Sequence, residues 1–116
     1  MAVFLVVTRP DKPEVMHEIA VTRKIVMGNS LYCDVVLDDK MVASMQCEVV
    51  QVKTGHIVVK NIDAKREILL NQVRIKKSAM KPDDEMKIGP FVVKIDPTKL
   101  TVDELAVLNS EYEEFV

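Results

Sequence analysis

Short apolar segments separated by turn signals constrain this chain more than any other feature. Valine and isoleucine dominate these segments, and β-branched side chains suit the pleated surface of a sheet better than a helix. Glycine, proline, asparagine and aspartate interrupt the sequence at intervals of about eight to twelve residues, a spacing typical of a β-sandwich. Strands are predicted over residues 2–8, 17–22, 24–27, 35–37, 46–53, 56–59, 68–70, 73–75, 85–88 and 91–95. The predicted fold class is therefore all-β.

The segment after residue 97 follows a helical pattern, because apolar residues recur there at three- and four-residue steps. These residues are Leu105, Leu108, Tyr112 and Phe115. Thr101 and Glu104 have the spacing of a capping box, and acidic side chains in the first turn suit the helix dipole. We predict an α-helix of about fourteen residues. It belongs to a helix or linker segment, residues 98–116, that follows a sandwich domain of residues 1–97.

Two roles remain open for this C-terminal helix. Its apolar face can pack against the sandwich, which would make the helix part of the domain. Alternatively, the helix can face outwards, as a linker to a downstream module or as a surface for self-association.

Opposite charges are concentrated in two stretches, although the net charge is only −2. Residues 60–81 contain seven basic and two acidic side chains, whereas residues 101–116 contain five acidic side chains and no basic one. The small net charge predicts no general attraction to nucleic acid or to an anionic membrane. The basic stretch is interpreted either as solvated strand faces or as a docking patch for an acidic or phosphorylated ligand.

The sequence contains no motif for catalysis, metal binding or cofactor binding. His17 and His56 are its histidines, neither falls in a nucleophile–base motif, and both are interpreted as satisfied surface side chains. The clustered carboxylates at residues 38–39 and 83–85 fall in turns and lack the ligand number of a calcium-binding loop. Glycine-rich phosphate-binding motifs are absent. We therefore predict a protein that is not an enzyme and that needs no cofactor or metal.

The two cysteines and the apolar runs indicate the compartment. Cys33 and Cys47 lie in apolar, strand-like contexts and are predicted to be buried free thiols, which fits a reducing cytoplasm. No apolar run approaches the ~20 residues that cross a bilayer, so no membrane span is predicted and the expected location is cytoplasmic. Aromatic side chains are missing from the basic stretch, so binding of nucleic acid is not predicted.

The sequence resembles a forkhead-associated (FHA) domain over residues 2–96. Residues 25–39 are similar to the family's Gly-Arg strand end, its short loop, its Asp-(Ile/Val)-Val-Leu strand and its acidic turn. Residues 42–49 resemble the block that carries a Ser-x-x-His motif, and Leu70-Asn71-Gln72 stands where the family has Val-Asn-Gly. Residues 81–95 resemble the closing loop, Ile-Gly turn and final strand. The resemblance implies a two-sheet FHA-like β-sandwich, followed here by a C-terminal α-helix, whose loops at one end bind phosphothreonine peptides.

The implied phosphate site departs from the family pattern. Asn29 stands at the phosphate-contacting arginine, Ala43 at the phosphate-binding serine and Gln46 at the histidine that braces the loop. Lys65 and Arg66 stand where the family has an asparagine. Because asparagine cannot reproduce the charged, bidentate fork of arginine, the resemblance implies a weakened grip on phosphate.

Two functions follow from the resemblance. The leading hypothesis is a degenerate FHA-type interaction domain with a scaffolding or regulatory role, which binds a protein or peptide without strict phosphate dependence. Such domains occur in bacterial secretion-ring components and signalling proteins. The alternative is a phosphothreonine reader in which Lys65 and Arg66 supply the charge, and Ser30 and Ser44 the hydroxyl groups. The predicted partner-binding residues are Asn29, Ser30, Leu31, Ala43, Ser44, Gln46, Lys65, Arg66 and Asn71, most of them in loops 28–31, 41–45 and 64–67.

Overall fold

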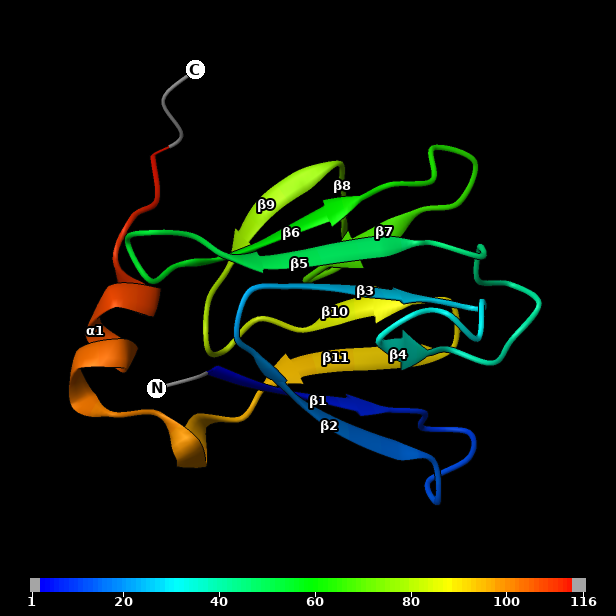
Figure 1. Cartoon of the computed structure of the whole chain (residues 1–116), viewed down its shortest axis with the longest axis horizontal. Helices are drawn as coiled ribbons and strands as arrows, with labels where there is room; N and C mark the ends of the chain where they lie inside the picture. The colour runs from blue at the N-terminus through cyan, green and yellow to red at the C-terminus, as the bar shows by residue number, and fades with distance from the viewer. Residues whose placement is uncertain (1–2, 114–116) are drawn as a thin grey trace.

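The strands form two sheets that pack face to face in the computed structural model, which describes residues 3–113 (Figure 1). One sheet has the order β2 (Met16–Val21), β1 (Val3–Thr8), β11 (Phe91–Ile95), β10 (Met86–Ile88), β7 (Ile68–Leu70) and β8 (Val73–Ile75). The other has the order β4 (Val35–Val36), β3 (Lys24–Gly28), β5 (Cys47–Gln51), β6 (Ile57–Asn61) and β9 (Lys77–Met80). β3 and β4 pair in parallel, whereas the hairpins, such as β5–β6, are antiparallel.

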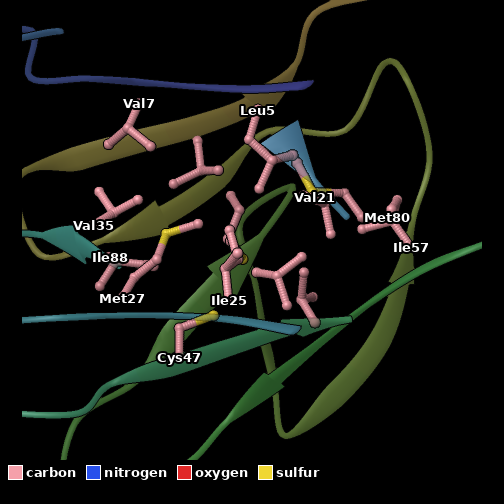
Figure 2. Packing of buried hydrophobic residues seen from close by; sticks show 14 of the residues in the cluster. Leu5, Val7, Val21, Ile25, Met27, Val35, Cys47, Ile57, Met80 and Ile88 are labelled. Carbon is pink, nitrogen blue, oxygen red and sulfur yellow. The ribbon is translucent and has the colours of Figure 1, made fainter. Parts of the chain in front are cut away.

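The core lies between the two sheets, and alternate side chains of the strands point into it (Figure 2). In β1, Val3, Leu5 and Val7 are buried while the side chains between them are half-buried. Ile25 and Met27 of β3 belong to the same cluster from the facing sheet. Burial of alternate side chains on both sheets is the physical origin of the apolar pattern in the sequence. It confirms the predicted two-sheet sandwich.

The strands lie close to their predicted positions, with one omission. β7, β8 and β11 have the predicted bounds, whereas β5 is shorter than the predicted 46–53 because it ends at Gln51 before the turn to β6. β9 was not predicted. Its sequence is Lys-Ser-Ala-Met, and Met80 is its buried side chain, so an edge strand of this kind leaves no alternating apolar pattern.

The C-terminal helix α1 (Val102–Asn109) begins as predicted but ends early. The capping box is present: Thr101 Oγ1 accepts a hydrogen bond from the Glu104 amide at 3.1 Å, and Glu104 Oε1 accepts one from the Thr101 amide at 2.9 Å. The predicted length of about fourteen residues is wrong, because Ser110 adopts an extended backbone and its hydroxyl donates to the Val107 carbonyl at 2.6 Å. A 3-10 turn, η1 (Pro97–Lys99), precedes the helix.

The helix packs on the sandwich through one leucine. Leu108 is 2% exposed and belongs to the core cluster, whereas Leu105 is 41% exposed. Tyr112 follows the helix rather than extending its apolar face, and Phe115 lies outside the described residues. Of the two roles considered for the helix, packing is the one observed. α1 and the beginning of β1 lie at the same end of the sandwich (Figure 1).

His56 is buried, so its interpretation as a surface histidine is wrong. Its Nδ1 lies 2.6 Å from Thr54 Oγ1, and its Nε2 lies 3.0 Å from Ser110 Oγ. Its ring also contacts that of Tyr112, with 5.2 Å between centroids. The histidine therefore ties the β5–β6 turn to the chain that follows α1. His56 and Ser110 are more than fifty residues apart in the sequence, so their contact could not be predicted from local patterns. His17 is exposed, as predicted.

The β7–β8 hairpin has a two-residue loop in which both residues have positive φ. Leu70 pairs with Val73, and Asn71 and Gln72 have φ angles of 51° and 71°. Two such angles mark the type I′ turn, which favours Asn-Gly because glycine tolerates the left-handed region. Gln72 therefore occupies a strained backbone position.

We expect Leu108→Ala to lower the free energy of unfolding by about 2–4 kcal/mol, because it leaves a cavity in the core. The matched control Leu105→Ala, on the exposed side of α1, should cost below about 1 kcal/mol. Removal of residues 98–116 should lower the free energy of unfolding for the same reason. Urea titration of the three variants measures these free energies, and equal values for the two leucine variants would contradict the observed packing.

We expect Gln72→Gly to raise the free energy of unfolding by about 1 kcal/mol, because glycine relieves the left-handed strain. Gln72→Ala keeps a Cβ atom at the same φ and should leave stability nearly unchanged. Thermal unfolding distinguishes the two. A Tm for Gln72→Gly at or below that of Gln72→Ala would contradict the strain at this turn.

Candidate functional site

Three loops meet at one end of the sandwich, opposite α1 (Figure 1). They connect β3 to β4, β4 to β5 and β6 to β7, and are called the apical loops below. The first two are joined by backbone hydrogen bonds, from the Asn29 amide to the Ala43 carbonyl at 2.9 Å and from the Ser30 amide to the Ser44 carbonyl at 3.1 Å. The Ile62 amide joins the third to the second by donating to the Gln46 carbonyl at 3.0 Å.

Gly28 permits the close contact between the first two loops. A Cβ atom at this position would lie 2.3 Å from the Ser44 carbonyl oxygen and 2.9 Å from the Ala43 carbonyl oxygen. Both distances are far inside van der Waals contact, and both neighbours are backbone atoms that cannot rotate away. Glycine at the end of β3 is therefore required by the approach of the second loop.

Gln46 braces the second and third apical loops from within. Its side chain is 1% exposed. Its Oε1 accepts a hydrogen bond from the Ala43 amide at 3.0 Å, and its Nε2 donates to Asn61 Oδ1 at 2.9 Å and to the Arg66 carbonyl at 3.4 Å. Asn61 Nδ2 also donates to the Arg66 carbonyl, at 2.8 Å. Gln46 therefore holds the loops in place, and neither it nor the buried Ala43 is exposed on the surface of the loops.

Asn29 directs its side chain into the loops. Its Nδ2 donates to the Asp39 carbonyl at 3.0 Å. The Asp39 carboxylate accepts from the Met41 amide at 2.8 Å and forms an ion pair with Arg9 at 3.0 Å. The side-chain amide of Asn29 and the guanidinium of Arg9 therefore both hold the β4–β5 loop through Asp39. Arg9 follows the end of β1 and also lies over the Phe91 ring.

Arg9 is shared between two carboxylates. Its Nε donates to Asp11 at 2.9 Å, and this hydrogen bond raises the pKa of Arg9 and lowers the pKa of Asp11. Asp11 is exposed, so solvent screens the pair and its contribution to stability is small. Its structural effect is to fix the guanidinium beside Asp39.

Large apolar side chains project from the first two apical loops. Tyr32 is fully exposed and Leu31 is 86% exposed, while Met41 and Met45 are each more than half exposed. The Ser30 hydroxyl accepts a hydrogen bond from the Tyr32 amide at 3.1 Å, which forms the tight turn that presents Leu31 and Tyr32. We call these four residues the apical apolar side chains.

Sequence reasoning selected Leu31 from this set. It placed Met41 and Met45 inside a predicted binding loop without selecting them individually, and it missed Tyr32. The available signal was the occurrence of large apolar residues inside segments otherwise marked as loops by glycine, asparagine, serine and aspartate. Their exposure is unusual enough to indicate a contact surface.

The third apical loop carries the predicted cations. Asp63 shapes it by accepting a hydrogen bond from the Lys65 amide at 2.8 Å, and its carboxylate lies 3.9 Å from Arg66 Nη1. Lys65 and Arg66 are exposed, as is Ser44 in the second loop. Arg66 and Met41 line the same hollow, of about 260 Å³, so the second and third loops share a surface.

Asn71 does not lie at this end of the molecule. It lies in the β7–β8 turn, separated from the third apical loop by the length of β7. Its Nδ2 donates to Asp84 at 2.7 Å, and its Oδ1 accepts from the Glu85 amide at 2.9 Å. Its prediction as an apical residue is wrong, because the short motif that contains it does not reveal the direction of β7. Its side chain fixes the start of β10.

The thiols differ in exposure. Cys47 is fully buried, and burial raises the pKa of its thiol to about 12. Cys33 is a half-buried free thiol, so the prediction of two buried thiols holds for Cys47 alone. The Cys33 Sγ donates to the Ser44 carbonyl at 3.2 Å and adds a further link between the first two apical loops.

Residues 3–113 contain neither a metal-binding cluster nor a membrane-spanning helix. In this range no three His, Cys, Asp or Glu side chains are grouped so as to hold a metal ion. None of the described helices combines the length and apolar composition that a membrane span requires.

This chain matches one protein family in sequence and several solved FHA structures in fold. Residues 17–99 match the family described as the cytoplasmic domain of the inner membrane component of the T3SS, the type III secretion system. The solved FHA domain of the CT664 protein from Chlamydia trachomatis is similar, with a TM-score of 0.70 and 11% identity over 82% of this chain and 96% of that one. A search of curated proteins found no match.

Two further solved structures have similar folds. The Slr1951 protein from Synechocystis sp. matches with a TM-score of 0.67 and 15% identity, over 82% of this chain and 94% of that one. A structure from work on phosphothreonine-dependent FHA domain interactions matches with a TM-score of 0.68 and 13% identity, over 84% of this chain and 99% of that one. At these identities the likeness shows the fold.

We expect Gln46→Ala to lower the free energy of unfolding by about 1–3 kcal/mol, because it leaves the buried Ala43 amide without its hydrogen-bond acceptor. Gln51→Ala is the matched control, since Gln51 is only half-buried and bonds within the β5–β6 turn. That control should cost below about 1 kcal/mol. Hydrogen exchange provides a second measurement, in which the Ala43 amide should lose protection. Full protection of this amide in Gln46→Ala would contradict the brace.

Proposed function

Because this chain belongs to the family of cytoplasmic domains of the T3SS inner membrane component, and because it has the FHA fold, we propose that it is a non-catalytic protein-interaction domain of degenerate FHA type. It binds a protein or peptide partner through the apical loops, without strict dependence on phosphate. Its role is scaffolding or regulatory, and its location is on the cytoplasmic side of a bacterial inner membrane, which the family description supports.

The observation that carries this proposal is the arrangement of Asn29. The resemblance puts this residue at the phosphate-contacting arginine, and its side chain is uncharged and bonded to the Asp39 carbonyl. A hydrogen bond to a charged group contributes about 1.5–3 kcal/mol, and an amide that is already bonded internally does not supply it. Ala43, at the serine position, has no hydroxyl group and is buried.

The exposed apolar side chains of the apical loops favour a partner with an apolar surface. Leu31, Tyr32, Met41 and Met45 present aromatic and flexible aliphatic groups where a phosphate site would present charge. Tyrosine and methionine are enriched at protein interfaces, since both bury apolar area with little penalty for adapting to a partner. We infer that these side chains supply the contact energy and that Ser30 and Ser44 supply polar contacts around them.

The alternative function is a phosphothreonine reader that uses the third apical loop. It is favoured by the exposure of Lys65, Arg66 and Ser44 on neighbouring loops. Arg66 is held weakly, because its contact with Asp63 is 3.9 Å long, and its guanidinium can turn to an incoming phosphate. In this case a cation from the third loop replaces the missing arginine.

A paired peptide library distinguishes the two functions. The full chain is titrated with phosphothreonine peptides and with the same peptides lacking phosphate. We expect equal affinities within each pair. The double variant Leu31→Ser/Tyr32→Ser should weaken binding about tenfold, and Arg66→Ala should change it little. Val73→Ser/Val102→Ser is the matched control, because both valines are exposed and lie away from the apical loops.

The opposite pattern would support the alternative. Micromolar binding that disappears on dephosphorylation and in Arg66→Ala would overturn phosphate independence. Equal weakening by the valine control would show that general loss of surface hydrophobicity, and not the apical loops, explains the effect.

A further inference from the structure

Six cationic side chains border a groove beside the sandwich, apart from the apical apolar side chains. They are Lys60 of β6, Lys65 and Arg66 of the third apical loop, Arg74 of β8, Lys76 between β8 and β9, and Lys77 of β9. The cavity has a volume of about 540 Å³, enough for several side chains of a peptide. We call it the basic groove.

Few carboxylates neutralise this groove. Glu67 is the acidic residue in its lining, and its Oε2 accepts from Arg74 Nε at 3.0 Å and Nη2 at 2.9 Å. Among the described residues, Lys60, Lys65 and Lys76 form no salt bridge. Cations gathered around a concave surface raise the local positive potential, which attracts and concentrates anionic partners.

The groove lies where two sheet edges meet. β8 is the edge strand of one sheet and β9 of the other, and the chain passes between them at Lys76. Lysine on an edge strand discourages pairing with a neutral or basic strand. The same charge favours an acidic strand, because each carboxylate then faces a cation instead of water alone.

We propose that the basic groove binds an acidic segment of a partner protein, an extended stretch rich in aspartate and glutamate. Its cations come from five parts of the chain and are spread along the groove, which suits a series of carboxylates better than one phosphate group. The lining contains no aromatic side chain on which bases could stack, which disfavours a nucleic acid strand. The proposal is independent of the apical apolar side chains, but it shares Lys65 and Arg66 with the alternative phosphothreonine reader.

One carboxylate of the chain itself lies beside β9. Glu111 lines a neighbouring hollow together with Lys77 and Lys81. Lys77 lines the basic groove as well, so an acidic side chain already shares a hollow with one of the groove cations.

The experiment uses the full chain and a fluorescent peptide of ten glutamates at low salt. Lys60→Gln/Lys76→Gln removes two groove cations, and Lys12→Gln/Lys53→Gln removes two exposed lysines elsewhere, so both variants have the same net charge. We expect the groove variant to weaken peptide binding about tenfold and the control less than about twofold. NMR amide shifts on addition of peptide should be largest at Ala64 and Ile75, which line the groove.

Three outcomes would overturn the proposal. Equal weakening in the two variants would show that net charge alone attracts the peptide. Tighter binding of a ten-nucleotide deoxythymidine strand, lost in the groove variant, would assign the groove to nucleic acid. Unchanged peptide binding accompanied by aggregation of the groove variant would show that the lysines serve only to prevent edge-to-edge pairing. Loss of function at the apical loops, tested with Leu31→Ser/Tyr32→Ser, leaves all these measurements unaffected.

Discussion

The side-chain amide of Gln46 is buried, so its polar atoms must form hydrogen bonds within the protein. The Ala43 amide and Asn61 satisfy it, so one side chain joins the second apical loop to the end of β6 and to the third loop. Because Gly28 lets the second loop lie directly on β3, the three loops form one assembly. The arrangement of the candidate site depends on this amide more than on any charged residue.

The loops combine a polar interior with an apolar exterior. Asn29, Asp39 and Gln46 direct their side chains inwards and hold the backbone, while Leu31 and Tyr32 project into solvent. A chain does not expose an aromatic ring fully without cost, and the polar bonds beneath it supply the rigidity that keeps it exposed. This division favours a preorganised contact surface, since less conformational entropy is lost when a partner binds.

Most of the fold could be predicted from the sequence, because burial of alternate side chains is a local signal. Buried and more exposed side chains alternate along residues 91–95, and this strand was predicted with its observed bounds. Lys77–Met80 is an edge strand paired with β6, and its side chains show almost no such alternation. The helix start at Thr101 was predictable from its capping box. Its end at Asn109 was not, because the Ser110 contacts with His56 depend on tertiary structure.

The site was predictable to a lesser extent. A motif resemblance located the three apical loops and the bracing position of Gln46, since these follow from residue order along the strands. The same resemblance misplaced Asn71, because short motifs do not reveal which end of β7 they occupy. Met41 and Met45 fall inside a predicted loop, but that signal does not determine their exposure, because a methionine in a loop can also pack inwards.

The position of α1 and of the first strand has a consequence for how the domain can be attached. Both lie at one end of a particle whose longest dimension is 37 Å, and the apical loops lie at the other (Figure 1). A solid support, a fluorescent label or an adjoining domain attached beside α1 or the beginning of β1 would lie at the end of the sandwich away from the apical loops. Attachment there would leave those loops open to solvent.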